Sequence, residues 1–279
     1  MIKLIADSGA TKAEWTLLTN GKKKTIATQG ISPYFFTEEK IITLLQEELL
    51  KKAPTAINAA SIHYYGTGMR NADNVKMLQG AFKKVFKGSK IEINDDMVSA
   101  ARALNGTKKG MTCNLGTGSF CCYYNGKKIV KQNPGIGYVL GDEGSGAYLG
   151  KKVLQYYMYN TFDEDLRFKF EDKYKTSPVE VLENVYRKPL ANRYLAGFTL
   201  FLVENRGHYM IENIIEDGLN DFFFTHLCKY KEVWTMPVNF IGSVAFGFKD
   251  VLQQLCNSYE FELGKIMKNP MQGLVDYHR

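Results

Sequence analysis

Short apolar runs separated by glycine turns fill the first thirty residues. The runs cover residues 2–6, 13–18 and 25–28, and each has the length and composition of a β-strand. Ser8-Gly9-Ala10 separates the first two runs, and Asn20-Gly21 separates the second and third. Asn-Gly is a strong hairpin signal because both residues tolerate the positive φ of a type I′ turn. The pattern therefore predicts a three-stranded antiparallel meander.

The same order of runs and turns returns after residue 110. Strands are predicted at 111–114, 119–124 and 127–131, with a tight turn at Leu115-Gly116-Thr117-Gly118 and a second type I′ signal at Asn125-Gly126. We interpret the recurrence as a duplicated fold. Chance recurrence of common hairpin chemistry is the alternative.

Helical periodicity dominates the rest of the chain, with a few further strands. The polar stretch 105–110 is the natural boundary between two domains. Helices are predicted at 37–52, 71–86, 97–104, 147–160, from 179 onward, at 190–205, 210–230 and 245–256, and strands at 57–66, 91–93 and 238–241.

Composition narrows the class of protein. The chain has 279 residues, of which 45% are hydrophobic and 23% charged, as in an ordinary soluble globular protein. The net charge of +7 is spread along the sequence, and its densest run, Lys22-Lys23-Lys24, is expected at a solvated hairpin tip. We therefore expect no nucleic-acid partner, although a positive field would favour a polyanion such as a nucleotide.

The cysteines and the apolar runs indicate the cellular compartment in which the protein is expected. The five cysteines form no Cys-x-x-Cys pair, which argues against a disulfide framework or a zinc knuckle. No run approaches the length needed to span a bilayer, and the first residues do not resemble a signal peptide. We expect a cytoplasmic protein without a membrane partner.

The first glycine turn carries candidate phosphate chemistry. Converging backbone amides and small residues form an anion-binding nest, to which Ser8, Thr11 and Lys12 would add donors around Gly9. Asp7, at the end of a buried strand, is suited to a hydrated Mg²⁺. An ordinary Asp-Ser-Gly turn is the alternative.

Two further glycine segments have similar properties. Gly116, Thr117 and Gly118 occupy the equivalent turn of the repeat, and neither turn is a Walker loop. Residues 135–146 are glycine-rich and open into a predicted helix, where an N-terminus would favour anions and Asp142 with Glu143 would suit sugar hydroxyls. Alternatively, these two carboxylates only complement the helix dipole.

Two strand ends complete the set of candidates. Asn94-Asp95-Asp96 follows a strand, where a rigid Asp could accept the proton of a hydroxyl during phosphoryl transfer. Either residue could instead be an N-cap, with Asp96 the expected cap. Residues 241–247 join a strand to a helix with small residues that would let a purine approach the backbone, although helix packing explains them equally well.

Taken in this order, the motifs resemble the superfamily of sugar kinases, heat-shock chaperones and actin. In particular the chain resembles the N-acetylglucosamine kinases grouped with the BadF/BadG/BcrA/BcrD ATPases. The most branch-specific piece is Gly141-Asp142-Glu143-Gly144-Ser145, and residues 269–278 resemble the closing helix of the family. The resemblance implies an α/β fold of two ribonuclease-H-like, actin-type ATPase domains with mixed five-stranded sheets and a cleft between them. The domains would cover 1–109, joined by a C-terminal helix at about 268–279, and 110–267.

The resemblance also implies the activity and the roles of residues. The expected reaction is ATP-dependent phosphorylation of a sugar hydroxyl, with N-acetylglucosamine or a related amino sugar as acceptor and Mg²⁺ as cofactor. Asp95 would be the catalytic base and Asp7 would hold Mg²⁺ through water. ATP would be bound by Ser8, Gly9, Thr11, Lys12, Gly116, Thr117, Gly118, Gly242, Ser243 and Gly247, and the sugar by Gly66, Thr67, Gly118, Asp142 and Gly146.

The sequence departs from the branch at two expected sugar contacts. Pro33 and Tyr34 stand where an Asn is usual after the third strand, and Phe120 replaces a polar residue. An ATPase that activates a partner protein without a sugar substrate is the alternative function, although the cysteines do not suit its iron–sulfur cluster. The acceptor and the oligomeric state, including a homodimer, stay open.

Overall fold

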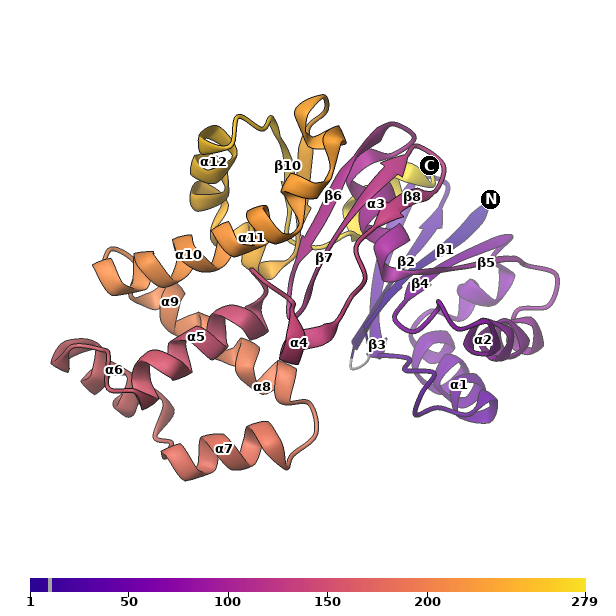
Figure 1. Ribbon diagram of the computed structural model, residues 1–279. Helices are drawn as coiled ribbons and strands as arrows, with labels where there is room; N and C mark the ends of the chain where they lie inside the picture. The colour runs from indigo at the N-terminus through magenta and orange to yellow at the C-terminus, as the bar shows by residue number, and fades with distance from the viewer. Residues whose placement is uncertain (10–11) are drawn as a thin grey trace. The chain divides into compact units, whose positions relative to one another are not determined.

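A computed structural model describes residues 1–9 and 12–279 (Figure 1). Two compact units are present. Unit 1 comprises Met1–Thr107 together with Pro270–Arg279, and unit 2 comprises Lys108–Asn269. Each unit contains one five-stranded sheet and its own helices.

The sheet of unit 1 is mixed and has the order β3-β2-β1-β4-β5. The first three strands pair antiparallel in a meander, and β4 and β5 run parallel to β1. The predicted meander is thereby confirmed. The strands are β1 (Ile2–Ser8), β2 (Lys12–Thr19), β3 (Lys22–Gln29), β4 (Ser61–Gly66) and β5 (Lys90–Asp95).

The sheet of unit 2 repeats this topology in the order β10-β9-β6-β7-β8. Here β6, β7 and β8 form the antiparallel meander, and β9 and β10 are parallel to β6. Identical strand order and direction in both sheets support the duplicated fold. The strands are β6 (Lys109–Leu115), β7 (Ser119–Asn125), β8 (Ile129–Gln132), β9 (Val238–Ile241) and β10 (Leu263–Met267).

The two Asn-Gly turns differ in conformation. Asn20 and Gly21 have φ values of 48° and 80°, as a type I′ turn requires. At Asn125-Gly126 only the glycine has a positive φ, 91°, so the predicted type I′ turn is wrong there. The Asn125 side chain instead accepts hydrogen bonds from the amides of Lys127 and Lys128, which holds Asn125 out of the left-handed region.

Helices cover both faces of the first sheet. Leu4 and Ala6 of β1 belong to the apolar core beneath α1 and α2, whereas Ile5 points to the other face and packs with α3 and α13. The predicted strand 57–66 starts later than expected, because Pro54 begins a 3₁₀ turn that ends at Asn58. The helices of unit 1 are α1 (Glu38–Leu44, continued by a π-helical segment Leu45–Leu50), α2 (Ala72–Val85), α3 (Asp96–Asn105) and α13 (Met271–Tyr277).

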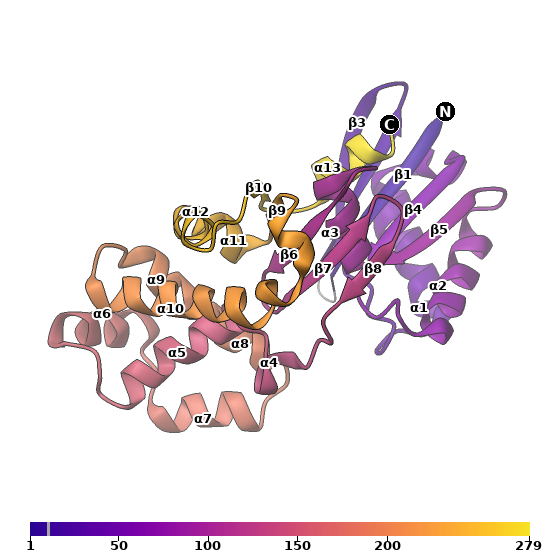
Figure 2. The same cartoon turned by 45° about the horizontal axis from the view of Figure 1, so that its top comes forward.

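Helices α5 to α10 of unit 2 gather beside its sheet (Figure 2). Two predicted helices are each divided in two, one at Phe198 after Gly197 and one at Phe248 after Gly247, since glycine is a poor helix former. The predicted helix 210–230 ends earlier, at Thr225. The helices are α4 (Gly137–Leu140), α5 (Gly146–Met158), α6 (Glu164–Tyr174), α7 (Pro178–Tyr186), α8 (Ala191–Gly197), α9 (Thr199–Glu204), α10 (Tyr209–Thr225), α11 (Ser243–Gly247) and α12 (Lys249–Ser258).

Candidate functional site

Three parallel strands of unit 1 end at the same edge of the sheet. In the strand register Ser8 of β1 pairs with Gly66 of β4, and Gly66 pairs with Asp95 of β5. Asp7, Gly66 and Asp95 were singled out separately in the sequence, and the sheet brings them together. The carboxyl ends of parallel strands are where ligands bind in open α/β sheets.

Asp7 lies at the last but one position of β1, where solvent reaches it only in part. Loss of hydration, together with the nearby carboxylates of Asp96 and Glu14, raises the pKa of its carboxyl from 3.8 to about 6. The Ser99 hydroxyl donates to Asp7 Oδ1 at 3.1 Å and opposes this shift. The concentration of negative charge around Asp7 suits a divalent cation.

The described part of the chain contains no ready-made metal cage. In residues 1–9 and 12–279 no group of three His, Cys, Asp or Glu could hold a metal ion. An Mg²⁺ ion at Asp7 would therefore keep several of its waters, as Mg²⁺ does when a single carboxylate and a phosphate bind it.

The first glycine turn is partly described. Ser8 is buried, and its hydroxyl accepts from the amide of Ile31 at 3.0 Å, so this side chain holds the loop after β3. The Gly9 amide donates to the Lys12 carbonyl at 3.0 Å, and both residues are exposed. Thr11, the remaining predicted phosphate ligand of this turn, lies outside the described residues.

Asp95 and Asp96 have different surroundings. Asp95, not Asp96, is the N-cap of α3: its Oδ1 accepts from the Val98 amide at 2.9 Å, and its Oδ2 lies 3.6 Å from Arg70 Nε. The expectation that Asp96 is the cap is wrong, because the helix begins at Asp96 itself, one residue earlier than a cap at Asp96 requires. Asp96 is exposed, and its charge acts on Asp7.

The loop after β4 is closely packed. A Cβ at Gly66 would lie 2.7 Å from the Tyr64 ring, so only glycine fits there. The Thr67 amide donates to the Ser8 carbonyl at 3.4 Å, which ties this loop to the end of β1. Beyond it, Tyr34 lies over Gly68 and is itself largely exposed, so an aromatic ring occupies the position of the first departure from the branch.

The second glycine turn, between β6 and β7, is held by neighbouring segments of unit 2. The Gly116 amide donates to the Gly118 carbonyl at 3.0 Å, and Thr117 is exposed at the tip. A Cβ at Gly242, which has a φ of 121°, would lie 2.2 Å from the Leu115 carbonyl oxygen. Gly242 thus lets the β9–α11 turn approach the second glycine turn. The hypothesis that a purine lies against residues 241–247 also needs small residues in this turn.

The amino terminus of α5 is also joined to this turn, and its amides are occupied. Gly146 N donates to the Gly116 carbonyl at 2.7 Å, and Ala147 N to the Thr117 carbonyl at 3.1 Å. The Ser145 hydroxyl caps the helix by accepting from the Tyr148 amide. The amides of Gly146 and Ala147 therefore have partners within unit 2, and the anion site at this terminus stays a prediction, as does the sugar contact of Gly146.

Asp142 lies over the second glycine turn. Its Oδ2 would be 3.0 Å from a Cβ at Gly118, and its carboxylate accepts from the backbone of Ser119. Asp142 has a φ of 58°, a left-handed conformation that a non-glycine residue seldom adopts. Burial and the charge of Glu143 raise the pKa of Asp142. Such a strained, partly desolvated carboxylate is a candidate ligand for hydroxyl groups.

The remaining predicted nucleotide contacts lie beside Gly242. Ser243 and Gly247 are the first and last residues of α11, and both are exposed. Two residues of the site were not predicted: Ser99, which donates to Asp7, and His226, which contacts Glu143 Oε2 at 2.9 Å. Neither has a local motif, because each acts on a residue distant in the sequence.

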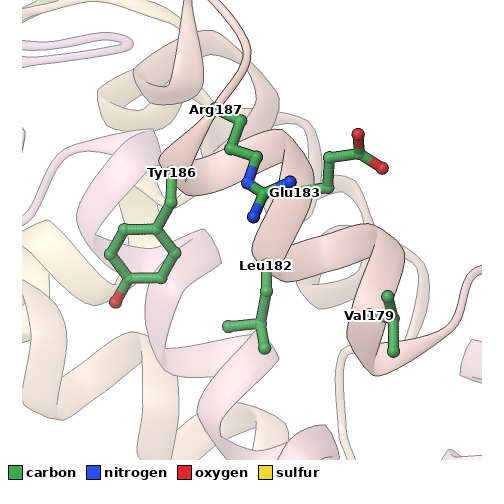
Figure 3. A pocket seen from close by; sticks show the side chains of 5 residues that line it. All are labelled: Val179, Leu182, Glu183, Tyr186 and Arg187. Atoms are coloured by element: carbon green, nitrogen blue, oxygen red, sulfur yellow. The ribbon is translucent and has the colours of Figure 1, made fainter.

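Two hollows of unit 2 adjoin α7. One, of about 430 Å³, is lined by residues of α7 and by Arg187, which follows this helix (Figure 3). The other, of about 420 Å³, lies between α7, α4 and α5 and is lined mainly by apolar and tyrosine side chains. Neither hollow is lined by a residue that was predicted to bind ATP or sugar. Among the described residues, no helix is both long and apolar enough to cross a membrane.

No family model matches this chain, but solved structures and a characterised relative resemble it. A solved protein of Porphyromonas gingivalis, a "putative N-acetylglucosamine kinase", is 34% identical; the match covers 99% of this chain and 98% of that one, with a TM-score of 0.92. A structure of the same description from Chromobacterium violaceum, 17% identical with a TM-score of 0.66 over 100% and 99% of the chains, shares the fold. The N-acetylmuramic acid/N-acetylglucosamine kinase of Clostridium acetobutylicum is 24% identical over 202 residues, 68% of this chain and 65% of the relative. The chain belongs to the N-acetylglucosamine kinase family, with the two-domain fold of the actin-like ATPases.

Proposed function

We propose that this protein transfers the γ-phosphoryl group of ATP to a hydroxyl group of an amino sugar, with N-acetylglucosamine as the first acceptor to test. The observation that carries the proposal is the meeting of Asp7, Gly66 and Asp95 at one edge of the first sheet, in a member of this family. Phosphoryl transfer depends on positioning and on charge stabilisation, and rigid strand ends supply both.

Each unit carries a glycine turn that we propose as a ligand of the nucleotide phosphates. The first glycine turn, with Gly9, Thr11 and Lys12, and the second, with Gly116, Thr117 and Gly118, offer amides and hydroxyls to the phosphates. The β9–α11 turn, at Gly242, Ser243 and Gly247, would contact the adenosine. Mg²⁺, when bound at Asp7 through water, would neutralise phosphate charge.

The proton acceptor belongs to the pair Asp95 and Asp96. Both oxygens of Asp95 already have partners, in the α3 cap and Arg70. Asp96 is exposed and its charge is felt at Asp7. We therefore assign the base to Asp96 in place of Asp95, and give Asp95 the role of fixing the start of α3 on which Asp96 stands.

Substitution of each aspartate by Asn separates these roles. Asp96→Asn should lower kcat for N-acetylglucosamine by about 10²–10⁴, the usual contribution of a general base, with ATP affinity unchanged. Asp95→Asn should keep most activity, because Asn is as good an N-cap as Asp. Loss of kcat in Asp95→Asn alone would return the base to Asp95.

The acceptor itself is tested by a coupled ADP-release assay over a panel of neutral and acidic amino sugars. Sugar-dependent ADP release supports the kinase. ATP hydrolysis that no sugar alters would overturn it in favour of an ATPase that acts on a partner protein. We place the protein in the cytoplasm, in keeping with its five free cysteines.

A further inference from the structure

A chain of hydrogen bonds in unit 2 ends at Glu143. His226, which follows α10, contacts Glu143 Oε2 through Nε2 at 2.9 Å. Its other nitrogen, Nδ1, lies 3.0 Å from Asn133 Nδ2, just beyond β8. The Tyr230 hydroxyl faces the Asn133 Oδ1 at 3.2 Å and the Cys121 carbonyl at 3.1 Å. Tyr230, Asn133 and His226 thus form one line of hydrogen-bonded side chains, of which His226 alone contacts the carboxylate of Glu143.

The chain has one direction. An ionised Glu143 can only accept, so His226 Nε2 must carry the proton that lies between them. His226 Nδ1 then accepts from the amide of Asn133, whose oxygen accepts from Tyr230. Burial raises the pKa of Tyr230, which keeps its hydroxyl a donor. The imidazole is thereby fixed in its tautomer and in its orientation toward Glu143.

This arrangement immobilises one oxygen of Glu143 and leaves the other open. Among the described residues no hydrogen bond reaches Glu143 Oε1, while the side chains of Glu143 and His226 keep only 19% and 12% of their exposure. Glu143 follows Asp142, which is held over Gly118. A half-buried carboxylate that is oriented by a hydrogen-bonded histidine is more than helix-dipole complementation requires, since a surface Glu serves that purpose.

We propose that Glu143 is a further sugar-binding residue, whose free oxygen accepts a hydrogen bond from an acceptor hydroxyl next to the one bound by Asp142, and that His226 is its positioning residue. The inference rests on the proposed kinase function and adds to it the recognition of two hydroxyl groups by adjacent carboxylates. Asn133 and Tyr230 act through His226.

The experiment measures the dissociation constant of N-acetylglucosamine by calorimetry, together with KM for sugar and for ATP. Glu143→Gln is isosteric, and His226→Phe keeps the ring packing against Phe222, whose centroid is 5.1 Å from that of His226. Both should weaken sugar binding by about tenfold, the effect of one lost hydrogen bond to a charged group, and leave KM for ATP unchanged. His226→Gln restores a donor for Glu143 and should recover sugar binding to within about threefold of wild type.

Monodeoxy analogues of N-acetylglucosamine give the decisive comparison. For the analogue that lacks the hydroxyl bound by Glu143, wild type and Glu143→Gln should bind equally. An equal loss on every analogue, or no loss in Glu143→Gln while the wild type still phosphorylates sugar, would overturn this inference and leave the kinase standing. Absence of sugar binding and turnover in the wild type would overturn both.

Discussion

At the scale of single residues, two glycines of one motif have different reasons to be glycine. Gly242 has a φ of 121° and a Cβ there would lie 2.2 Å from a backbone oxygen. Gly247 has no positive φ, and a Cβ would meet nothing within 4 Å. The backbone therefore demands glycine at 242, whereas at 247 only the approach of a ligand could demand it.

Substitution by Ala distinguishes the two. Gly242→Ala should lower the free energy of unfolding by about 1–3 kcal/mol, because both the backbone at position 242 and the Leu115 carbonyl must move. Gly247→Ala should leave stability unchanged or raise it slightly, as Ala in a helix does. If ATP lies against α11, Gly247→Ala will raise KM for ATP without loss of stability. An unchanged denaturation midpoint in Gly242→Ala would contradict the strain.

Asp7 illustrates a residue kept at a cost in stability. Its pKa of about 6 exceeds 3.8, so the folded state prefers the neutral acid, and stability falls as pH rises from about 4 to 6 and is level above. Asp7→Asn removes that cost and should stabilise the protein by about 1–3 kcal/mol at pH 8. The gain should vanish near pH 4 in thermal unfolding. Kinase activity should be lost at every pH, since Asn cannot replace the charge; an active Asp7→Asn would contradict the role of Asp7.

At the scale of elements, local signals predicted strands better than helix ends. Asn20-Gly21 and the two glycine turns fix both meanders, because the turn geometry depends on the turn residues themselves. Strand β10 was missed: Leu263–Met267 is an edge strand with no alternating pattern. Helix α6 was also missed, although Asp163, Glu164 and Asp165 form a readable N-cap and acidic first turn.

The turns and strand ends of the candidate site could be predicted from the sequence, but the side chains that hold them in place could not. Asp7, Gly66 and Asp95 could be picked out as strand ends, and register then places them together. The sequence does not reveal that the first amides of α5 are occupied, nor that Ser99 contacts Asp7 and His226 contacts Glu143. Each of these contacts depends on packing between segments that are distant in the sequence. For the same reason the sequence could not tell that Asp95, not Asp96, caps α3.

At the scale of the whole chain, the polypeptide leaves unit 1, builds unit 2, and returns to unit 1 with its last ten residues. Helix α13 packs on α3, and His278 is buried against β4, with its ring 3.8 Å from that of His63. Arg102 donates to the Tyr65 hydroxyl at 2.8 Å, and Tyr65 in turn donates to His278 Nε2 at 2.7 Å. Folding of unit 1 therefore depends on the last residues of the chain. His278 must be neutral, because its Nε2 accepts a hydrogen bond from the Tyr65 hydroxyl.

The contacts of His278 should make the stability of unit 1 fall at acidic pH. Burial, together with the charges of His63, Arg102 and Lys3, lowers the pKa of His278 from 6.5 to about 3, while Glu92 opposes the shift. A depressed histidine pKa means that the unfolded chain takes up the proton first, so stability is complete above pH 6.5 and is lost as pH falls toward 3. Between pH 7 and pH 5 the loss should be about 2 kcal/mol.

His278→Gln isolates this effect, because Gln can accept from Tyr65 but does not titrate. Trp15, buried in unit 1, reports its unfolding once the exposed Trp234 is replaced by Phe in every variant. In that background His278→Gln should be less stable than its parent at pH 7, and the gap should narrow by about 2 kcal/mol at pH 5. Asp7 titrates in the opposite sense in both proteins and cancels from the difference. His208→Gln, a histidine of unit 2, serves as the control and should leave the Trp15 transition unchanged. A gap that stays constant from pH 7 to pH 5 would show that His278 does not need to be neutral, and that the return of the chain is held by the apolar face of α13 alone.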